Sequence, residues 1–286
     1  MQQRIGIIGG SGLYHIEGVE IIDELIIDTP YGKPSDNLTL ARVHGQEVVF
    51  LPRHGKKHSI PPHQINYRAN IYAMKLAAVS QLISISAVGS LKEDIAPGDF
   101  VLPDQFVDRT HSRASTFFDG PVVAHVSMAD PICGCLQSRL RQACQQQGLK
   151  THNNGNYLVM QGPQFSTRAE SKLYRSWGMD VIGMTNMPEA KLAREAEMCY
   201  ATVAMCTDYD CWHENEADVS VASVIEVMQE NVKQAKSMLQ LFFAHDKPQQ
   251  NTCSCQNTLE HSIFADLKAQ DDQALRPIYA LVERFL

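Results

Sequence analysis

The alternation of short apolar runs with longer amphipathic segments is the feature that most constrains how this chain folds. The apolar runs predict strands and cover residues 5–8, 47–51, 82–87, 99–102, 157–160, 181–184 and 200–206. The amphipathic segments predict helices and cover residues 63–79, 131–147, 168–176, 187–197 and 219–243. Strands that alternate with helices in this way are typical of a wound α/β sheet.

The chain of 286 residues divides at one point. Residues 1–246 hold the alternating pattern without an internal repeat, so we expect them to form a single domain. Residues 247–257 are polar, and a helical pattern then runs from residue 259 to residue 286, broken at Pro277. We therefore expect residues 247–286 to form a C-terminal extension, a helical appendage packed on the domain.

Composition excludes several kinds of partner. Hydrophobic residues make up 44% of the chain and charged residues 20%, as in ordinary soluble globular proteins. No apolar run reaches about 18 residues, so we expect no membrane partner. The apolar run near the N-terminus is too short for a signal peptide, which makes a cytoplasmic location the expectation. A formal net charge of −7 argues against a broad nucleic-acid-binding surface.

Eight cysteines are too few for a scaffold built on disulfides at this length. Six of them lie in periodic segments, where buried thiols are the default expectation. Cys253 and Cys255 lie instead in the polar stretch, and zinc knuckles usually place about two to four residues between such a pair. We therefore expect no metal site, and interpret the pair as oxidisable or as two tail thiols.

Two carboxylates, Asp208 and Asp210, follow the apolar run at residues 200–206. Ligands of open α/β sheets bind outside the carboxyl ends of the strands. These acids could accept hydrogen bonds from an amino group, or hold the proton that a nitrogenous leaving group needs. The alternative is a solvated turn that begins a loop.

Three other strand ends carry groups that suit an anion. The turn at residues 9–12 offers glycine backbone N–H groups and a hydroxyl, and its spacing does not match the dinucleotide-binding pattern. Arg53 is a bidentate partner for phosphate, and His54 beside it adds a donor. The run at residues 82–87 ends in Ser86 and Ala87. Tight or solvated turns are the alternatives, but together these ends indicate one shared phosphate pocket.

Two further residues at strand ends have a functional and a structural interpretation. Phe165 could stack on a planar base, or act as a hydrophobic staple for the helix that follows. Thr185 could offer its hydroxyl to a ligand, or simply cap the next helix.

Taken in their order along the chain, the motifs resemble those of the nucleoside phosphorylase family, specifically the trimeric 5′-methylthioadenosine phosphorylases. The resemblance runs from about Gly6 to Phe243 and rests on residues 6–13, 53–55, 66–71, 89–91, 97–99, 105–110, 165–171 and 207–212. It implies one α/β domain with a central mixed twisted sheet flanked by helices. It also implies a homotrimer or a dimer of trimers.

The resemblance implies phosphorolysis of 5′-methylthioadenosine to adenine and 5-methylthioribose-1-phosphate, a step of methionine and purine salvage. Inorganic phosphate is then a co-substrate, and no metal or organic cofactor is needed. The alternative within this fold is a purine nucleoside or methylthioinosine phosphorylase, and a more distant one is a non-catalytic nucleotide-binding module. Relatives acting on 6-oxopurines carry asparagine where this chain has Asp208, which favours an adenine nucleoside.

The resemblance also assigns site residues by position. Those matching phosphate-binding positions are Ser11, Arg53, His54, Ser86, Ala87 and Thr185. Those matching nucleoside-binding positions are Phe165 and Ser166 for the purine, Met184 for the ribose, and His58, Val221 and Ile225 for the 5′-methylthio group. His125 matches a residue that reaches the site of a neighbouring subunit. Asp208 and Asp210 match the catalytic positions, with Asp208 protonating the leaving adenine.

Three departures from the family pattern stand out. Ser11 and Ser86 occupy positions where many relatives have threonine, so the hydroxyl is kept. Gln164 replaces a common arginine, which alters a supporting ion pair. The Cys253-Ser254-Cys255 segment resembles the C-terminal Cys-x-Cys of hyperthermophilic members, in which disulfides contribute stability.

Overall fold

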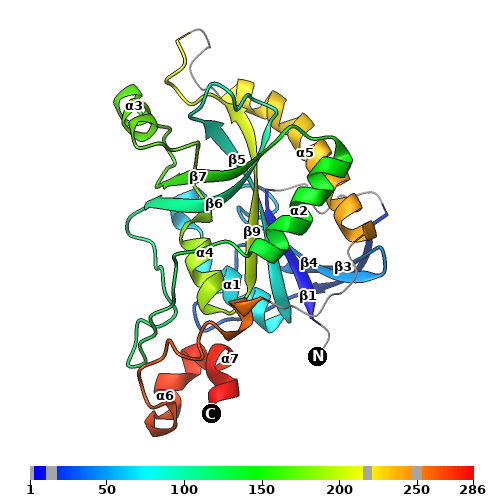
Figure 1. Ribbon diagram of the computed structural model, residues 1–286. Helices are drawn as coiled ribbons and strands as arrows, with labels where there is room; N and C mark the ends of the chain where they lie inside the picture. The colour runs from blue at the N-terminus through cyan, green and yellow to red at the C-terminus, as the bar shows by residue number, and fades with distance from the viewer. Residues whose placement is uncertain (1–2, 11–17, 215–220, 246–252) are drawn as a thin grey trace.

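A computed structural model describes residues 3–10, 18–214, 221–245 and 253–286, with the side chains of 221–223 left out. It contains a nine-stranded mixed sheet with helices packed around it (Figure 1). The strand order is β2-β3-β4-β1-β5-β8-β7-β6-β9. The strands are β1 (Arg4–Gly9), β2 (Glu20–Leu25), β3 (Leu38–Val43), β4 (Gln46–Pro52), β5 (Val79–Ser90), β6 (Phe100–Arg109), β7 (Thr151–Met160), β8 (Val181–Gly183) and β9 (Cys199–Asp208).

The far end of this sheet closes on itself. Strand β9 pairs in parallel with β5 and in antiparallel fashion with β6. Because β8 and β7 connect β5 to β6, these five strands form a closed ring. In the register of this ring, Gly89 of β5 faces both Ile182 of β8 and Asp208 of β9. The ring therefore brings the ends of three strands that are distant in sequence to one point.

Two pairs of helices cover the sheet. Helix α2 (Gly134–Gln147) packs on α5 (Val221–His245), and both contact β9. Helix α1 (Tyr67–Leu76) packs on α4 (Asn186–Glu195), and both contact β5. Helix α3 (Arg168–Ser176) lies apart from these pairs (Figure 1) and begins with a capping box, in which Thr167 and Glu170 satisfy each other's backbone N–H groups.

The sequence predicted the α/β class and the helices well, but several boundaries were wrong. The helix predicted at residues 63–79 is shorter, because Asn66 caps α1 by accepting a hydrogen bond from the Ala69 N–H. It ends at Leu76, and the left-handed φ of 60° at Ala78 prevents its continuation before β5 starts. Strands β2 and β3 were missed. Every residue of β2 except the last is exposed, so its sequence contains no buried apolar run.

The C-terminal extension is made of short turns. Six such elements are described: η2 (Ser254–Asn257), η3 (Leu267–Ala269), α6 (Asp272–Leu275), η4 (Arg276–Ile278), α7 (Tyr279–Val282) and η5 (Glu283–Phe285). The segment contacts the domain where Ala280 N–H donates to Tyr72 Oη, and where Leu259 N–H and Arg284 donate to Glu197. The predicted boundary at 246/247 lies outside the described residues.

None of the described helices has the length and apolar character that a membrane span requires.

Candidate active site

A cavity of about 520 Å³ opens at the end of the closed ring, under helix α5. Its wall combines a polar end, a pair of carboxylates and an apolar side. The lining residues are Gly10, Arg53, His54, His58, Pro62, Ile85, Ser86, Ala87, Val88, Gly89, Met160, Phe165, Ile182, Gly183, Met184, Thr185, Met205, Thr207, Asp208, Asp210, Val224, Ile225, Met228 and Val232.

Asp208 is held rigidly at the end of β9. Its Oδ1 accepts a hydrogen bond from the Asp210 N–H at 2.8 Å, and its Oδ2 lies 2.7 Å from Thr207 Oγ1. Burial raises the pKa of Asp208, and the nearby charge of Asp210 adds to this, while the two hydrogen bonds oppose it. The net effect is an upward shift of the Asp208 pKa.

The Thr207 hydroxyl can form a hydrogen bond with Asp208 in either protonation state of that carboxyl. Its hydroxyl lies 3.2 Å from the Val88 carbonyl oxygen as well as 2.7 Å from Asp208 Oδ2. A hydroxyl has one hydrogen to donate, and two acceptors compete for it here. When the hydrogen points to Val88, a protonated Asp208 can donate to Thr207 Oγ1 instead. Either protonation state of Asp208 is therefore accommodated without moving the side chain.

Asp210 offers an unsatisfied acceptor. The residue is buried, and its left-handed φ of 53° turns the chain sharply after β9. Its Oδ2 is buried and makes no hydrogen bond to any described residue. Burial raises the pKa of Asp210, opposed by the hydroxyls of Ser171 and Ser166. A buried polar atom without a partner is unusual in a protein interior, and the residue that carries it lines the cavity.

Gly89 leaves the space that the carboxylate pair needs. A Cβ atom at this position would lie 2.8 Å from Asp208 Oδ1 and 3.4 Å from the Asp210 Cβ. Any larger residue would push on a carboxylate that two hydrogen bonds hold in place. A glycine at this position of β5 is therefore needed for the acid pair to fit.

Arg53 anchors the polar end of the cavity. It is almost fully buried and forms a bidentate ion pair with Glu189, with Nε to Oε2 at 2.7 Å and Nη2 to Oε1 at 3.0 Å. Burial lowers the pKa of Arg53, but the Glu189 carboxylate outweighs this and raises it overall. Nη1 donates to the Ile85 carbonyl, and its second N–H makes no hydrogen bond to a described residue. That N–H remains available to a ligand.

The tautomer of His54 is fixed by its surroundings. Nδ1 lies 2.8 Å from the Ile60 carbonyl oxygen, which can only accept, so Nδ1 carries the hydrogen. Burial lowers the pKa of His54 to about 4, opposed by the Ile60 carbonyl. The free ring is therefore neutral near pH 7, and Nε2 is an acceptor. We expected a second donor at this position, and Nε2 donates only after the ring gains a proton.

Three other predicted phosphate residues line the same end. Ser86 and Thr185 are buried, and Ala87 lies between β5 positions that face the core. Thr185 precedes α4 but makes no side-chain capping hydrogen bond, so the capping interpretation is wrong. Its hydroxyl is positioned by the strand end and not by the helix.

Most predicted nucleoside residues line the same cavity. Met184 and His58 line the cavity, and Phe165 lies at its wall with 48% of its surface exposed. Ile225 lines it from α5. Ser166 does not line it, and its hydroxyl instead lies 3.7 Å from Met160 Sδ.

Besides Ser166, three predicted residues are not placed at the cavity. Ser11 and the Val221 side chain lie outside the described residues. His125 is distant from the lining within one chain, and its N–H donates to the Ser262 carbonyl at 2.8 Å.

Sequence reasoning missed several residues that complete the site. Glu189 holds Arg53 in place, and Arg113 ties the chain after β7 to the chain after β8 by donating to Gln161 and Met184 carbonyl oxygens. Their partners are distant in sequence, so no local pattern signals them. Val224 and Met228 were visible in the apolar stripe of α5, but the stripe alone does not tell a core from a cavity wall.

Comparison with known proteins shows the family to which the chain belongs. Residues 4–244 match the model of the family described as Phosphorylase superfamily. A relative from Geobacter sulfurreducens, S-methyl-5′-thioadenosine phosphorylase, is 51% identical over 94% of both chains.

Two solved structures are also similar. A methylthioadenosine phosphorylase from an antarctic soil metagenomic library matches with a TM-score of 0.91 and 43% identity, covering 98% of each chain. The methylthioadenosine phosphorylase of Schistosoma mansoni in complex with adenine matches with a TM-score of 0.85 and 35% identity, covering 91% of this chain and 99% of that one.

The fold is thus that of the nucleoside phosphorylase class, enzymes that transfer a pentosyl group. Within the phosphorylase superfamily, the chain belongs to the S-methyl-5′-thioadenosine phosphorylase family.

Proposed function

We propose that this chain catalyses the phosphorolysis of 5′-methylthioadenosine, releasing adenine and 5-methylthioribose-1-phosphate for methionine and purine salvage. The proposal is supported most directly by one cavity that joins an arginine- and hydroxyl-lined end to the Asp208–Asp210 pair. The names of the relatives point to the same substrate, and the Schistosoma mansoni structure is a complex with adenine.

Phosphate would bind at the polar end and attack the ribose. Arg53 offers its remaining N–H, and Ser86 and Thr185 add hydroxyls at neighbouring strand ends. A phosphate dianion would favour protonation of His54, or would share its own proton with Nε2. Cleavage of the N-glycosidic bond builds positive charge on the ribose, which the dianion stabilises as it attacks. Phosphate is thus the co-substrate, and we propose no metal or organic cofactor for the reaction.

Asp208 would assist the departure of adenine. Adenine is a poor leaving group as an anion, so N7 needs a proton as the bond breaks. Burial raises the pKa of Asp208, so that the carboxyl can hold this proton. After transfer, the Thr207 hydroxyl can turn to donate to the new carboxylate.

Asp210 would recognise the base. Its unsatisfied Oδ2 can accept a hydrogen bond from the exocyclic amino group of adenine. A 6-oxopurine would present a carbonyl oxygen there and leave two acceptors facing each other.

The apolar side chains of Val224, Ile225 and Met228 would then receive the methylthio group at the other end of the nucleoside.

Adenine release from 5′-methylthioadenosine is expected to depend on added phosphate. The measurement follows adenine by chromatography with and without phosphate, beside parallel reactions with inosine and methylthioinosine. Fast release from methylthioadenosine and slow release from both 6-oxopurines supports the proposal. Equal or faster cleavage of methylthioinosine contradicts the role of Asp210, and adenine release without phosphate contradicts phosphorolysis.

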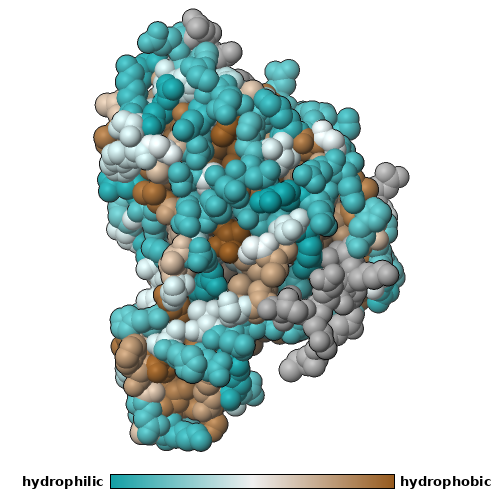
Figure 2. Space-filling view, in the orientation of Figure 1, coloured by the Kyte–Doolittle hydropathy of each residue, from teal (hydrophilic) through white to brown (hydrophobic). Residues whose placement is uncertain are grey.

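We also propose that the chain forms a homotrimer or a dimer of trimers, in which His125 reaches a neighbouring cavity. Near His125, Val123 is 44% exposed and Phe264 is 79% exposed. Figure 2 shows hydrophobic surface over the C-terminal segment, which suits a subunit contact.

Light scattering is expected to give about three or six times the chain mass of 31.9 kDa. Phe264→Asp is expected to lower that mass by placing a charge in the subunit contact. Phe285→Asp changes a side chain that packs against the core of its own chain, and it serves as the control for effects of unfolding on the measured mass. A wild-type mass of one chain contradicts the assembly.

A further inference from the structure

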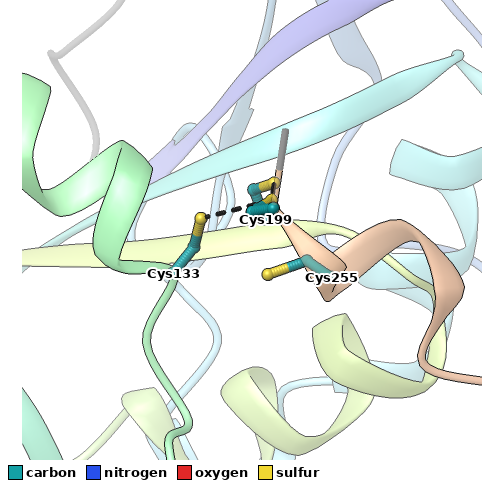
Figure 3. Close-up of side chains that lie close together, drawn as sticks. Cys133, Cys199 and Cys255 are labelled. Atoms are coloured by element: carbon teal, nitrogen blue, oxygen red, sulfur yellow. Dashed lines mark hydrogen bonds between the residues drawn. The ribbon is translucent and has the colours of Figure 1, made fainter. Parts of the chain in front are cut away.

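Four cysteines from three distant segments meet outside the active site. Cys133 precedes α2, Cys199 begins β9, and Cys253 and Cys255 lie at the start of the C-terminal extension. Their Sγ atoms all lie within 4.8 Å of one another, and all but Cys253 are buried. Figure 3 shows Cys133, Cys199 and Cys255 pointing toward a common centre.

The spacing of the sulfurs suits a tetrahedral ion. The Sγ of Cys253 lies 3.8 Å from that of Cys133 and 3.1 Å from that of Cys199. Zinc binds thiolates at about 2.3 Å, so a regular tetrahedron separates the sulfurs by about 3.8 Å. A set of four sulfurs is a complete ligand shell for structural zinc, with no position left for water. Since all the sulfurs already lie within 4.8 Å of one another, small side-chain shifts would complete the tetrahedron.

The surroundings supply positive charge. Four thiolates around Zn²⁺ carry a net charge of −2, which a buried site must offset. Arg194 lies beside the cluster, with Nη1 donating to Cys255 Sγ at 3.7 Å. Its Nε is buried without a hydrogen-bond partner, and it forms no ion pair with a described carboxylate. This guanidinium suits an anionic neighbour better than four neutral thiols.

We infer that Cys133, Cys199, Cys253 and Cys255 bind one Zn²⁺ as a closed structural site. Binding releases the four thiol protons and forms four Zn–S bonds. Sequence spacing argued against zinc at Cys253 and Cys255, because a knuckle takes both ligand pairs from local motifs. Here the other two ligands come from the α2 and β9 ends, which only the fold brings close. Disulfides would instead join the sulfurs in pairs and require no common centre.

The site would fasten the extension to the domain. Downstream of Cys255, Ile263 bridges to Ala124, and the Ser262 carbonyl accepts from the His125 N–H. Zinc at the start of the extension would limit how far these contacts can separate. Loss of the metal is therefore expected to loosen the His125 region while leaving the cavity residues in place.

Zinc content of the full chain tests the site. The protein is expressed with added ZnSO₄, purified under reducing conditions and measured by elemental mass spectrometry. We expect about one zinc per chain for the wild type and for Cys135→Ser, an exposed thiol outside the four. Cys255→Ser and Cys253→Ser are expected to lose most of the metal. Wild-type protein without zinc, or variants that keep it, overturns the inference.

A second measurement does not depend on how the variants fold. Exchange of the wild-type metal for Co²⁺ is expected to produce the intense visible absorption of tetrahedral cobalt bound to thiolates. Absence of that spectrum overturns the inference. The inference is also overturned if the intact mass under non-reducing conditions is lower than that of the reduced chain by two hydrogens per disulfide, because the sulfurs are then bonded to one another. A chelator that lowers the melting temperature of wild type but not of Cys255→Ser supports it.

Discussion

Replacing Asp208 with asparagine is expected to lower kcat for methylthioadenosine phosphorolysis by about 100- to 10,000-fold. Asparagine keeps the shape of the side chain, and its Oδ1 still accepts from the Asp210 N–H. It cannot give a proton to the departing adenine, so the loss falls on the chemical step. KM for methylthioadenosine is expected to change much less than kcat.

The pH profile distinguishes proton donation from a structural role. A general acid works only while it is protonated, so wild-type kcat is expected to fall as pH rises through the elevated pKa of Asp208. Asp208→Asn is expected to lose this alkaline limb. Asp104→Asn, on β6 and outside the cavity lining, is the matched control and is expected to keep wild-type kcat and pH dependence. A kcat for Asp208→Asn close to wild type removes Asp208 from the role of acid.

Replacing Glu189 with glutamine is expected to lower the free energy of unfolding by about 3–5 kcal/mol. Glutamine leaves the charge of Arg53 buried without its partner, since both side chains are shielded from solvent. It also disturbs the hydrogen bonds that Ser84 and Tyr200 donate to Glu189 Oε1. Because Arg53 then loses its orientation, KM for phosphate is expected to rise as well.

Urea unfolding monitored by fluorescence measures this effect. Glu20→Gln, which breaks the exposed ion pair with Arg42, is the matched control. Its free energy of unfolding is expected to equal that of the wild type. A Glu189→Gln variant that is as stable as the control contradicts the importance of the buried pair. Unchanged KM for phosphate in a folded variant contradicts the positioning role.

Sequence patterns anticipated most of the polar side chains of the cavity because strand ends converge in an α/β sheet. Arg53, Ser86, Thr185 and Asp208 were each placed at the end of an apolar run, and the structure brings all four to one cavity. Their precise chemistry was harder to foresee. His54 was expected to donate, and the Ile60 carbonyl instead leaves Nε2 as an acceptor.

The sequence alone determined the α/β class, the positions of the main helices and many of the polar residues that line the cavity, because periodicity and strand-end residues are local properties of a chain. The tertiary structure alone decided the closure of the β5–β9 ring, the Arg53–Glu189 pair and the meeting of four cysteines. Each depends on contacts between segments tens to more than a hundred residues apart. No local sequence pattern indicates such contacts, because they form only when packing brings the segments together.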